Sequence, residues 1–253
     1  MAELAATAPA QVAALLILFA RVGAIWMLLP LFSEDSIPGP ARLLMALGLS
    51  LALYGVLGSR VAPFAADDVS LVRTILIELT IGLAIGSLIR TMMQAASMAG
   101  SIISVQIGLS SVLVFDPALG GQTPVLARLI ALAATLTCFA ANLHHEWIAA
   151  IVRSYEVFPV GALPNPGDWA GLFVTTIGKA TALAVSLSAP FLVYGLLFNV
   201  ALGLASRLAP ALQIFFIAQP ANLLLGIALL GLTIGAILST FAATMSNWLT
   251  SGW

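Results

Sequence analysis

The chain has 253 residues, of which 61% are hydrophobic and 8% charged, and its formal net charge is −1. Soluble domains normally carry about 25% charged residues, so lipid or other protein subunits must cover much of this surface. The charge balance excludes a basic nucleic-acid-binding platform. The single cysteine, Cys138, excludes an intrachain disulfide and a cysteine-based metal cage. Its apolar neighbours indicate a buried thiol that packs as a small hydrophobe.

The N-terminus lacks the features of a cleavable signal peptide. Residues 1–9 contain Glu3 and no Lys or Arg ahead of the first apolar stretch, whereas signal peptides carry a basic segment there. We therefore expect the first apolar segment to remain in the mature protein.

Uncharged stretches predict an all-α, multi-helix membrane-type protein built of helical hairpins. A helix needs about 20 apolar residues to cross the hydrocarbon of a bilayer, and several stretches reach that length. Four polar loops with proline are expected at residues 33–42, 59–73, 116–127 and 153–171. The last two helices should form a hairpin with its corner at Arg207-Leu208-Ala209-Pro210. The expected helices are residues 11–33, 43–59, 74–89, 91–115, 129–143, 172–206 and 211–249.

One of these helices, residues 74–89, is only marginally apolar. Its Ile and Leu side chains favour insertion by roughly 3–5 kcal/mol, but an ionised Glu78 near its middle costs on the order of 3 kcal/mol. We expect this helix to need a protein neighbour and Glu78 to be paired inside a helix bundle. A proton relay through Glu78 is the alternative, although no second acid lies near it in the sequence.

Small residues recur at helical spacing, which allows helix backbones to approach closely. Two pairs are Gly82–Gly86 and Gly231–Gly235, and Gly100, Ser104 and Gly108 form a triplet. We expect ordinary packing between helices of this chain at these positions. The segment around the triplet, residues 94–111, is too polar to face lipid. It should be buried in a bundle or line a water-filled path.

The sequence offers no catalytic or metal site. His144-His145-Glu146 contains potential ligands, but adjacent residues on a helix point about 100° apart and no third ligand is in register. No nucleophile-elbow, phosphate-loop, dinucleotide-binding or zinc-protease motif occurs. We expect neither an enzyme nor a bound cofactor.

The loop at residues 115–124 is the most specific local feature. Asp116-Pro117 starts a turn, and Gly120-Gly121 permits almost any backbone conformation. A plain connector is expected to be polar, but Phe115 and Leu119 make this loop partly apolar. The loop therefore has something to bury before Pro124 starts the next helix.

The order and spacing of these features resemble the FliR family of flagellar type III export-gate proteins, which shares its fold with the corresponding injectisome subunit. The resemblance covers essentially the whole chain. It is carried by Arg21, Pro30, Glu78, Gly82, Gly86, Gly100, Gln106-Ile107-Gly108, Asp116-Pro117, Pro124, Arg128, Ser154-Tyr155, Phe158-Pro159-Val160-Gly161, Ala189-Pro190, Asn199, Gly203, Arg207 and Pro210.

Three positions depart from the family pattern. Ser101 stands where the family usually has Glu, so an ion pair made there is absent or relocated. Leu143 replaces a common Gly, and residues 211–215 vary a usual run, which leaves the roles of Ser101 and Gln213 open.

The resemblance implies a FliR-like subunit that winds with FliP-like and FliQ-like subunits into a helical gate for unfolded flagellar substrates. It also implies a FlhB-like neighbour and a place in the bacterial inner membrane, at the flagellar basal body. Residues 1–168 would be a FliP-like portion and residues 169–253 a FliQ-like hairpin. We expect such a subunit to be unstable alone, and much of it to be buried in the assembly rather than facing lipid.

The resemblance also assigns roles to residues. The candidate gating plug comprises Gln106, Gly108, Phe115, Asp116, Pro117, Leu119, Gly120 and Gly121. The candidate structural or interface residues are Arg21, Pro30, Glu78, Gly82, Gly86, Gly100, Ser104, Arg128, Arg207 and Pro210.

Two other classes of function stay open at this point. A secondary transporter for a small solute would predict inverted repeats and paired intramembrane charges, and the sequence shows no repeat. A membrane scaffold without a conduit is the third possibility.

Overall fold

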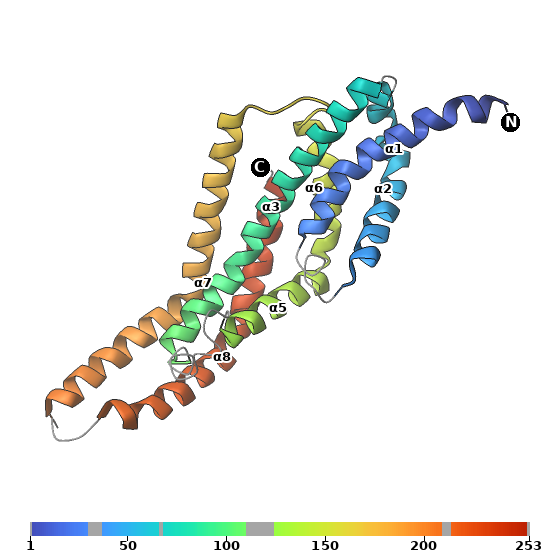
Figure 1. Ribbon diagram of the computed structural model, residues 1–253. Coiled ribbons are helices and arrows are strands. Elements are labelled where there is room, and N and C mark those ends of the chain that lie inside the picture. The colour runs from blue at the N-terminus through green and yellow to red at the C-terminus, as the bar shows by residue number, and fades with distance from the viewer. Residues whose placement is uncertain (1, 30–36, 66–67, 110–123, 209–213, 252–253) are drawn as a thin grey trace. The chain divides into compact units, whose positions relative to one another are not determined.

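The computed structural model describes residues 2–29, 37–65, 68–109, 124–208 and 214–251, with only the backbone described at 2–8, 65, 68–69 and 214–217. All regular structure in these ranges is helical, as predicted (Figure 1). In chain order the elements are α1 (Ala2–Leu28), α2 (Gly39–Val61), the 3-10 helix η1 (Ala62–Ala65), α3 (Asp68–Gln106), α5 (Val125–Ala140), α6 (Leu143–Val157), α7 (Pro166–Leu208) and α8 (Ile214–Ser251).

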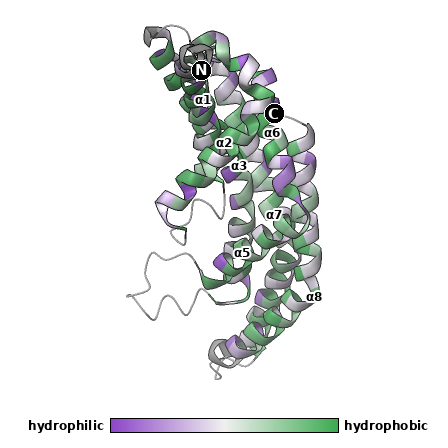
Figure 2. Ribbon diagram, turned by 90° about the vertical axis from the view of Figure 1, so that its right-hand side faces the viewer, coloured by the Kyte–Doolittle hydropathy of each residue, from purple (hydrophilic) through white to green (hydrophobic). Residues whose placement is uncertain are grey.

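The helices have the length and composition of membrane spans. Within the described ranges, α1, α2, α3, α7 and α8 are long and apolar enough to cross a membrane, and α5 and α6 qualify as a pair with a break between them. Apolar residues dominate the ribbons in Figure 2. The prediction of a multi-helix membrane-type protein is therefore confirmed.

Helix α3 corrects the sequence prediction most strongly. The predicted helices 74–89 and 91–115 are one helix that begins at Asp68, so most of the predicted loop 59–73 is helical. The prediction placed a boundary at Arg90 because of its charge. Arginine is a good helix former, however, and this side chain is exposed. The helix ends at Gln106 rather than Phe115.

Helix α6 was not predicted and takes up part of the predicted loop 153–171. The prediction relied on uncharged stretches, and the histidines, acids and arginine of α6 interrupt such a stretch. The helical signal was present in the spacing of one apolar face, at three- and four-residue intervals. The buried residues on that face are Leu143, Trp147, Ala150, Ile151, Ser154 and Tyr155.

Other helix ends differ from the prediction by a few residues. Helix α1 begins at Ala2 and ends at Leu28, whereas residues 11–33 were predicted, so the observed helix is displaced toward the N-terminus. Helix α2, Gly39–Val61, extends beyond the predicted 43–59 at both ends. Helix α5 begins directly after Pro124, where proline was expected to start a helix. The two long C-terminal helices are confirmed. Arg207 and Leu208 belong to the end of α7, and Pro210 lies outside the described residues.

Contacts divide the chain into two compact units, each assembled from separated stretches. Unit 1 comprises Met1–Met92, His144–Thr176 and Leu249–Trp253, and unit 2 comprises Met93–Leu143 and Ile177–Trp248. The predicted division between residues 168 and 169 concerns likeness to two other subunits, which contacts within one chain do not test.

In unit 1, glycines bring α3 directly against α1. A Cβ added at Gly82 would lie 2.6 Å from the carbonyl oxygen of Arg21 and 2.8 Å from Cβ of Ala24. One added at Gly86 would lie 2.9 Å from Cβ of Leu28. The predicted close packing at this glycine pair is confirmed.

In unit 2 the glycines behave in two ways. A Cβ at Gly100 would lie 2.6 Å from Cα of Ala127, so α3 and α5 are in close contact there. At Gly231 and Gly235 an added Cβ would meet no atom within 4 Å. The expectation that this second pair packs within the chain is wrong, because both glycines lie on an exposed face of α8.

The last turn of α8 is fastened to α6 within unit 1. Nη2 of Arg153 donates a hydrogen bond of 2.7 Å to the carbonyl oxygen of Leu249. Carbonyls in the last turn of a helix have no intrahelical donor, and Arg153 supplies a donor to one of them in α8.

The packing of α3 on α1 generates a direct test. Replacing Gly82 with alanine should destabilise the protein by about 1–3 kcal/mol, as overpacking of a tight contact does. Gly48→Ala is the matched control, since a Cβ there meets nothing within 4 Å and alanine favours helix over glycine by about 1 kcal/mol. The measurement is the thermal unfolding midpoint of the full-length protein, purified in detergent with its co-purifying subunits. Equal midpoints for the two variants would contradict the close packing.

Candidate functional site

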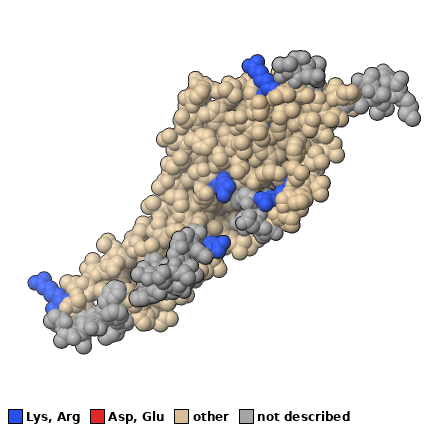
Figure 3. Space-filling view, viewed as in Figure 1, with Lys and Arg blue, Asp and Glu red and all other residues tan. Residues whose placement is uncertain are grey.

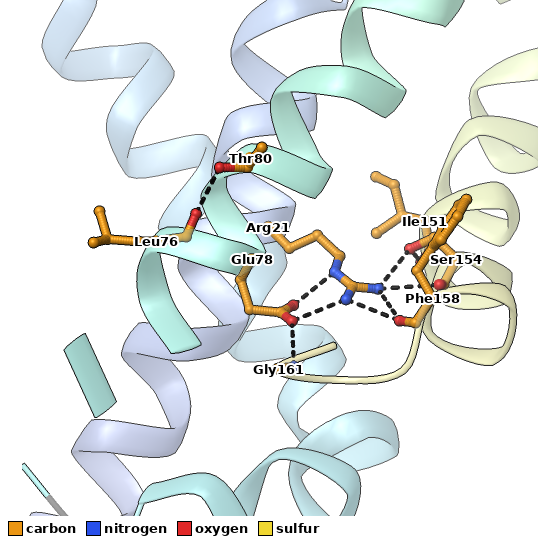
Figure 4. Close-up of polar contacts among 8 residues, drawn as sticks. All are labelled: Arg21, Leu76, Glu78, Thr80, Ile151, Ser154, Phe158 and Gly161. Atoms are coloured by element: carbon orange, nitrogen blue, oxygen red, sulfur yellow. Dashed lines mark hydrogen bonds and ion pairs between the residues drawn. The ribbon is translucent and has the colours of Figure 1, made fainter. Parts of the chain in front are cut away.

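Unit 1 contains a fully buried ion pair between α1 and α3. Nε of Arg21 donates to Oε2 of Glu78 at 2.6 Å, and Nη2 donates to Oε1 at 2.9 Å (Figure 4). Both side chains are 0% exposed. Two parallel hydrogen bonds between guanidinium and carboxylate make the strongest form of such a pair. The expectation that Glu78 is paired inside a helix bundle is confirmed.

The same guanidinium also caps the end of α6. Nη1 of Arg21 donates to the carbonyl oxygen of Ser154 at 3.0 Å, and Nη1 and Nη2 each donate to that of Phe158 at 2.9 Å. The carbonyl end of a helix carries partial negative charge and favours a nearby cation. All five N–H groups of a guanidinium are thereby used.

The turn after α6 completes the cluster. Gly161 has φ of +71°, a conformation that favours glycine, and its N–H donates to Oε1 of Glu78 at 3.1 Å. The ring of Tyr155 covers the guanidinium, with Cζ of Arg21 4.0 Å from the ring centroid. Figure 4 shows the arginine side chain lying between the carboxylate and the carbonyls of α6. One cluster therefore joins α1, α3, α6 and the chain that leads to α7.

This arrangement stabilises structure and offers little to a substrate. Both oxygens of Glu78 accept hydrogen bonds from Arg21, and Oε1 accepts a third from Gly161. The enclosed carboxylate thus favours structural pairing over a proton relay. Within the ranges that the structure describes, no three His, Cys, Asp or Glu residues gather as metal ligands.

The second place where predicted site residues meet is the end of α3, in unit 2. Gly108 has φ of +83°. Its N–H donates to the carbonyl of Val105 at 3.2 Å, and the N–H of Leu109 donates to that of Ser104 at 3.0 Å. This pair of bonds is the Schellman ending of a helix, which requires a left-handed residue and favours glycine. Gly108 therefore determines where α3 stops.

The remaining predicted site residues are not gathered into one site. Ser104 is buried beside the end of α3, whereas Arg128 on α5 and Arg207 on α7 are exposed. On the face in Figure 3, uncharged residues make up almost all of the surface of the described residues. Eight predicted residues lie outside the described ranges: Pro30, Phe115, Asp116, Pro117, Leu119, Gly120, Gly121 and Pro210.

Sequence reasoning missed several members of these clusters. Ser154 and Phe158 act through backbone carbonyls, which have no side-chain signature. Tyr194 on α7 and Asn222 on α8 had a signal, because polar side chains are rare in apolar helices and usually have a role there. Tyr194 donates to Oδ1 of Asn222 at 2.7 Å.

Two apolar hollows flank Trp169 at the start of α7 in unit 1. The larger, of about 430 Å³, is lined by residues that include Phe158 and Leu172. The smaller, of about 260 Å³, is lined by residues that include Ile81 and Phe173. The ring of Phe158 stacks on Trp169 with centroids 4.9 Å apart. The lining of the larger hollow also includes the polar residues Asn165 and Asp168, whereas the smaller one is lined by apolar residues and Thr80.

These features define a multi-helix membrane-type protein that is organised around a buried ion pair. The chain matches the family described as bacterial export proteins, family 1, over residues 12–248. The chain belongs to this family.

Named relatives agree with this assignment. The chain is 38% identical over 227 residues to flagellar biosynthetic protein FliR of Caulobacter vibrioides, covering 90% of each protein. It is 33% identical over 212 residues to FliR of Escherichia coli, covering 83% of this chain and 80% of the relative. It is 28% identical over 207 residues to Yop proteins translocation protein T of Yersinia pestis, covering 81% and 79%. The predicted resemblance to the FliR family is confirmed.

The buried ion pair predicts a large, asymmetric mutational effect. Arg21→Met should destabilise the protein by about 3–5 kcal/mol, because it leaves the buried Glu78 unpaired. The double variant Arg21→Met/Glu78→Met should recover part of this loss, though not all, because α6 also loses its cap. Thermal unfolding of the full-length protein, purified in detergent with its co-purifying subunits, measures both losses.

Arg60→Gln is the control for this experiment. It breaks the Arg60–Glu156 pair of unit 1, at 3.3 Å, whose side chains are 46% and 61% exposed. An exposed pair contributes at most about 1 kcal/mol. A loss for Arg21→Met no larger than that for Arg60→Gln would refute the central role of the buried pair.

Proposed function

We propose that this chain is a subunit of the flagellar type III protein export gate, situated in the bacterial inner membrane at the flagellar basal body. The family and the flagellar names of its relatives support the proposal. In this proposal the chain has no catalytic activity. It forms part of a conduit for unfolded flagellar substrates, and other components supply the energy.

The observation that carries the proposal is how little of α8 the chain itself covers. Only 11% of the most apolar part of α8 is buried, compared with 50% for α1 and α3. Leu224 and Leu232 are 70% and 85% exposed. Something outside the chain must cover this surface. The open glycines Gly231 and Gly235 would let the backbone of a partner helix approach closely.

The proposed partners are FliP-like and FliQ-like subunits in one helical assembly, with a FlhB-like subunit beside it. Residues 1–168 would take a FliP-like place and residues 169–253 a FliQ-like place. A protein partner explains the glycines on α8 better than lipid does, since fluid acyl chains do not need a close backbone approach. A solute transporter gains no support, because the Arg21–Glu78 pair is sealed.

We also propose that Phe115–Gln122 is the plug of the resting gate. A closed channel needs an apolar constriction that excludes water, which Phe115 and Leu119 would supply. Gly120-Gly121 would let the segment move aside without steric cost. Arg128, which is exposed at the start of α5, is the proposed electrostatic partner of Asp116.

The proposed assembly predicts that the chain is stable only with its partners. Expressed alone, it should aggregate or be degraded, because its apolar helix faces are uncovered. Co-expressed with FliP-like and FliQ-like subunits from the same operon or genome, it should co-purify with them as one species in detergent. Size-exclusion chromatography with mass measurement tests this. A monodisperse, folded monomer would overturn the proposal.

The proposed plug predicts a leak. Deleting Asp116–Gln122 should raise the permeability of cells to ions or small dyes, while the chain still co-purifies with its partners. Phe115→Ala should give a weaker leak, because it removes one apolar group from the constriction. Val125→Ala, at an 80% exposed position on α5, is the control and should leave permeability unchanged. An assembled deletion variant with wild-type tightness would show that the segment is a connector.

A further inference from the structure

Three helices of unit 2 meet at the end of α3 through a small polar cluster. The hydroxyl of Tyr194 on α7 lies 2.7 Å from Oδ1 and 3.0 Å from the carbonyl oxygen of Asn222 on α8. Nδ2 of Asn222 donates in turn to the carbonyl oxygen of Gln106, at 3.4 Å. Asn222 is only 7% exposed, and a buried amide is costly unless it is hydrogen-bonded.

The bond to Gln106 supplies what the end of α3 lacks. The carbonyls of Ile103, Ser104 and Val105 accept hydrogen bonds from the N–H groups of residues 107–109. Gln106 follows them in the last turn, where the helix itself provides no donor. Asn222 provides one from α8, so α8 caps α3 through a side chain.

Glycines shape the surfaces that meet there. A Cβ at Gly195 on α7 would overlap the side chain of Gln106, and a Cβ at Gly226 on α8 would overlap that of Ile107. A Cβ at Gly108 would lie 2.9 Å from Oε1 of Gln219. The fit is therefore specific to this arrangement of the three helices, which indicates a built contact rather than a chance approach.

We propose that Tyr194 and Asn222 form a latch that holds the end of α3 against the α7–α8 hairpin and keeps the export conduit in its resting state. The role of this latch in the resting state of the conduit rests on the proposed function. The latch consists of a short bond between two neutral side chains and a long bond to one carbonyl. Neutral hydrogen bonds are weaker than charge-assisted ones, so this contact opens more readily than the Arg21–Glu78 cluster of unit 1. Tyr194 and Asn222 thus act as positioning residues for residues 107–109, the described residues that directly follow α3.

Tyr194→Phe tests the latch, since it removes one hydroxyl and keeps the ring. Amide hydrogen exchange at residues 107–109 is measured in the full-length protein, purified in detergent with its co-purifying subunits. We expect exchange about fivefold faster, in keeping with the loss of one net hydrogen bond. We also expect a dye leak in cells, weaker than that of the Asp116–Gln122 deletion. Tyr54→Phe, which removes a phenolic hydroxyl from α2 in unit 1, should change neither quantity.

A second variant guards against a packing effect. Asn222→Leu should speed amide hydrogen exchange at residues 107–109 at least as much as Tyr194→Phe does. The double variant should add nothing to Asn222→Leu, because both changes break the same interaction. Additive effects would overturn the assignment of the two residues to one latch.

The two readouts separate the possible failures. Unchanged exchange in Tyr194→Phe would overturn the latch itself. Faster exchange without a leak, in cells where the Asp116–Gln122 deletion does leak, would overturn the link between latch and resting state. If the deletion does not leak either, the proposed plug fails, and faster exchange still establishes that Tyr194 and Asn222 hold the end of α3.

Discussion

Burial of the Arg21 guanidinium is the constraint on which unit 1 depends. An arginine cannot lose its charge in a protein, and an uncompensated buried ion costs several kcal/mol. Every N–H of Arg21 must therefore find an acceptor inside the protein. Those acceptors are Glu78 on α3 and the carbonyls of Ser154 and Phe158 at the end of α6. The hydrogen bonds of this one side chain therefore hold together three segments that lie far apart in the sequence.

The same principle appears at other helix ends. The end of α3 receives a donor from Asn222, and that of α8 receives one from Arg153. In an apolar environment water does not satisfy the last carbonyls of a helix, so protein groups must do so. In a chain with 8% charged residues, these few polar groups distinguish one helix packing from the alternatives, whereas apolar contacts are non-directional.

The sequence predicted those features that depend on local composition. Apolar stretches identified most of the helices, because hydrophobicity is read residue by residue. The free-energy cost of an ionised Glu78 in an apolar helix correctly predicted that this side chain is paired. The identity of this partner could not be predicted, since Arg21 lies 57 residues from Glu78 and no local sequence pattern connects the two. Arg90 misled the prediction because a charge was treated as a helix boundary, although an exposed arginine leaves the backbone ladder intact.

The candidate site was less predictable than the helices. Carbonyl groups of Ser154 and Phe158 contribute to it through backbone geometry, and every residue has a carbonyl. Helix α6, which presents them, went unnoticed because its charges masked an apolar face of regular spacing. The spacing of Gly231 and Gly235 matched that of Gly82 and Gly86, yet only the latter pair packs within the chain. A pattern of small residues indicates that a helix backbone can be approached closely. It does not indicate whether the partner is a helix of the same chain or another molecule.

The bond between Arg153 and Leu249 bears on how the protein is made. Unit 1 takes its first residues from the start of the chain and its last from the stretch that begins at Leu249. The ribosome must therefore translate all of unit 2, through Trp248, before it produces the residue that closes unit 1. During that interval Nη2 of Arg153 lacks the acceptor that the carbonyl oxygen of Leu249 provides. The native contacts of unit 1 are therefore completed only at the end of synthesis, after the whole of unit 2 has been translated.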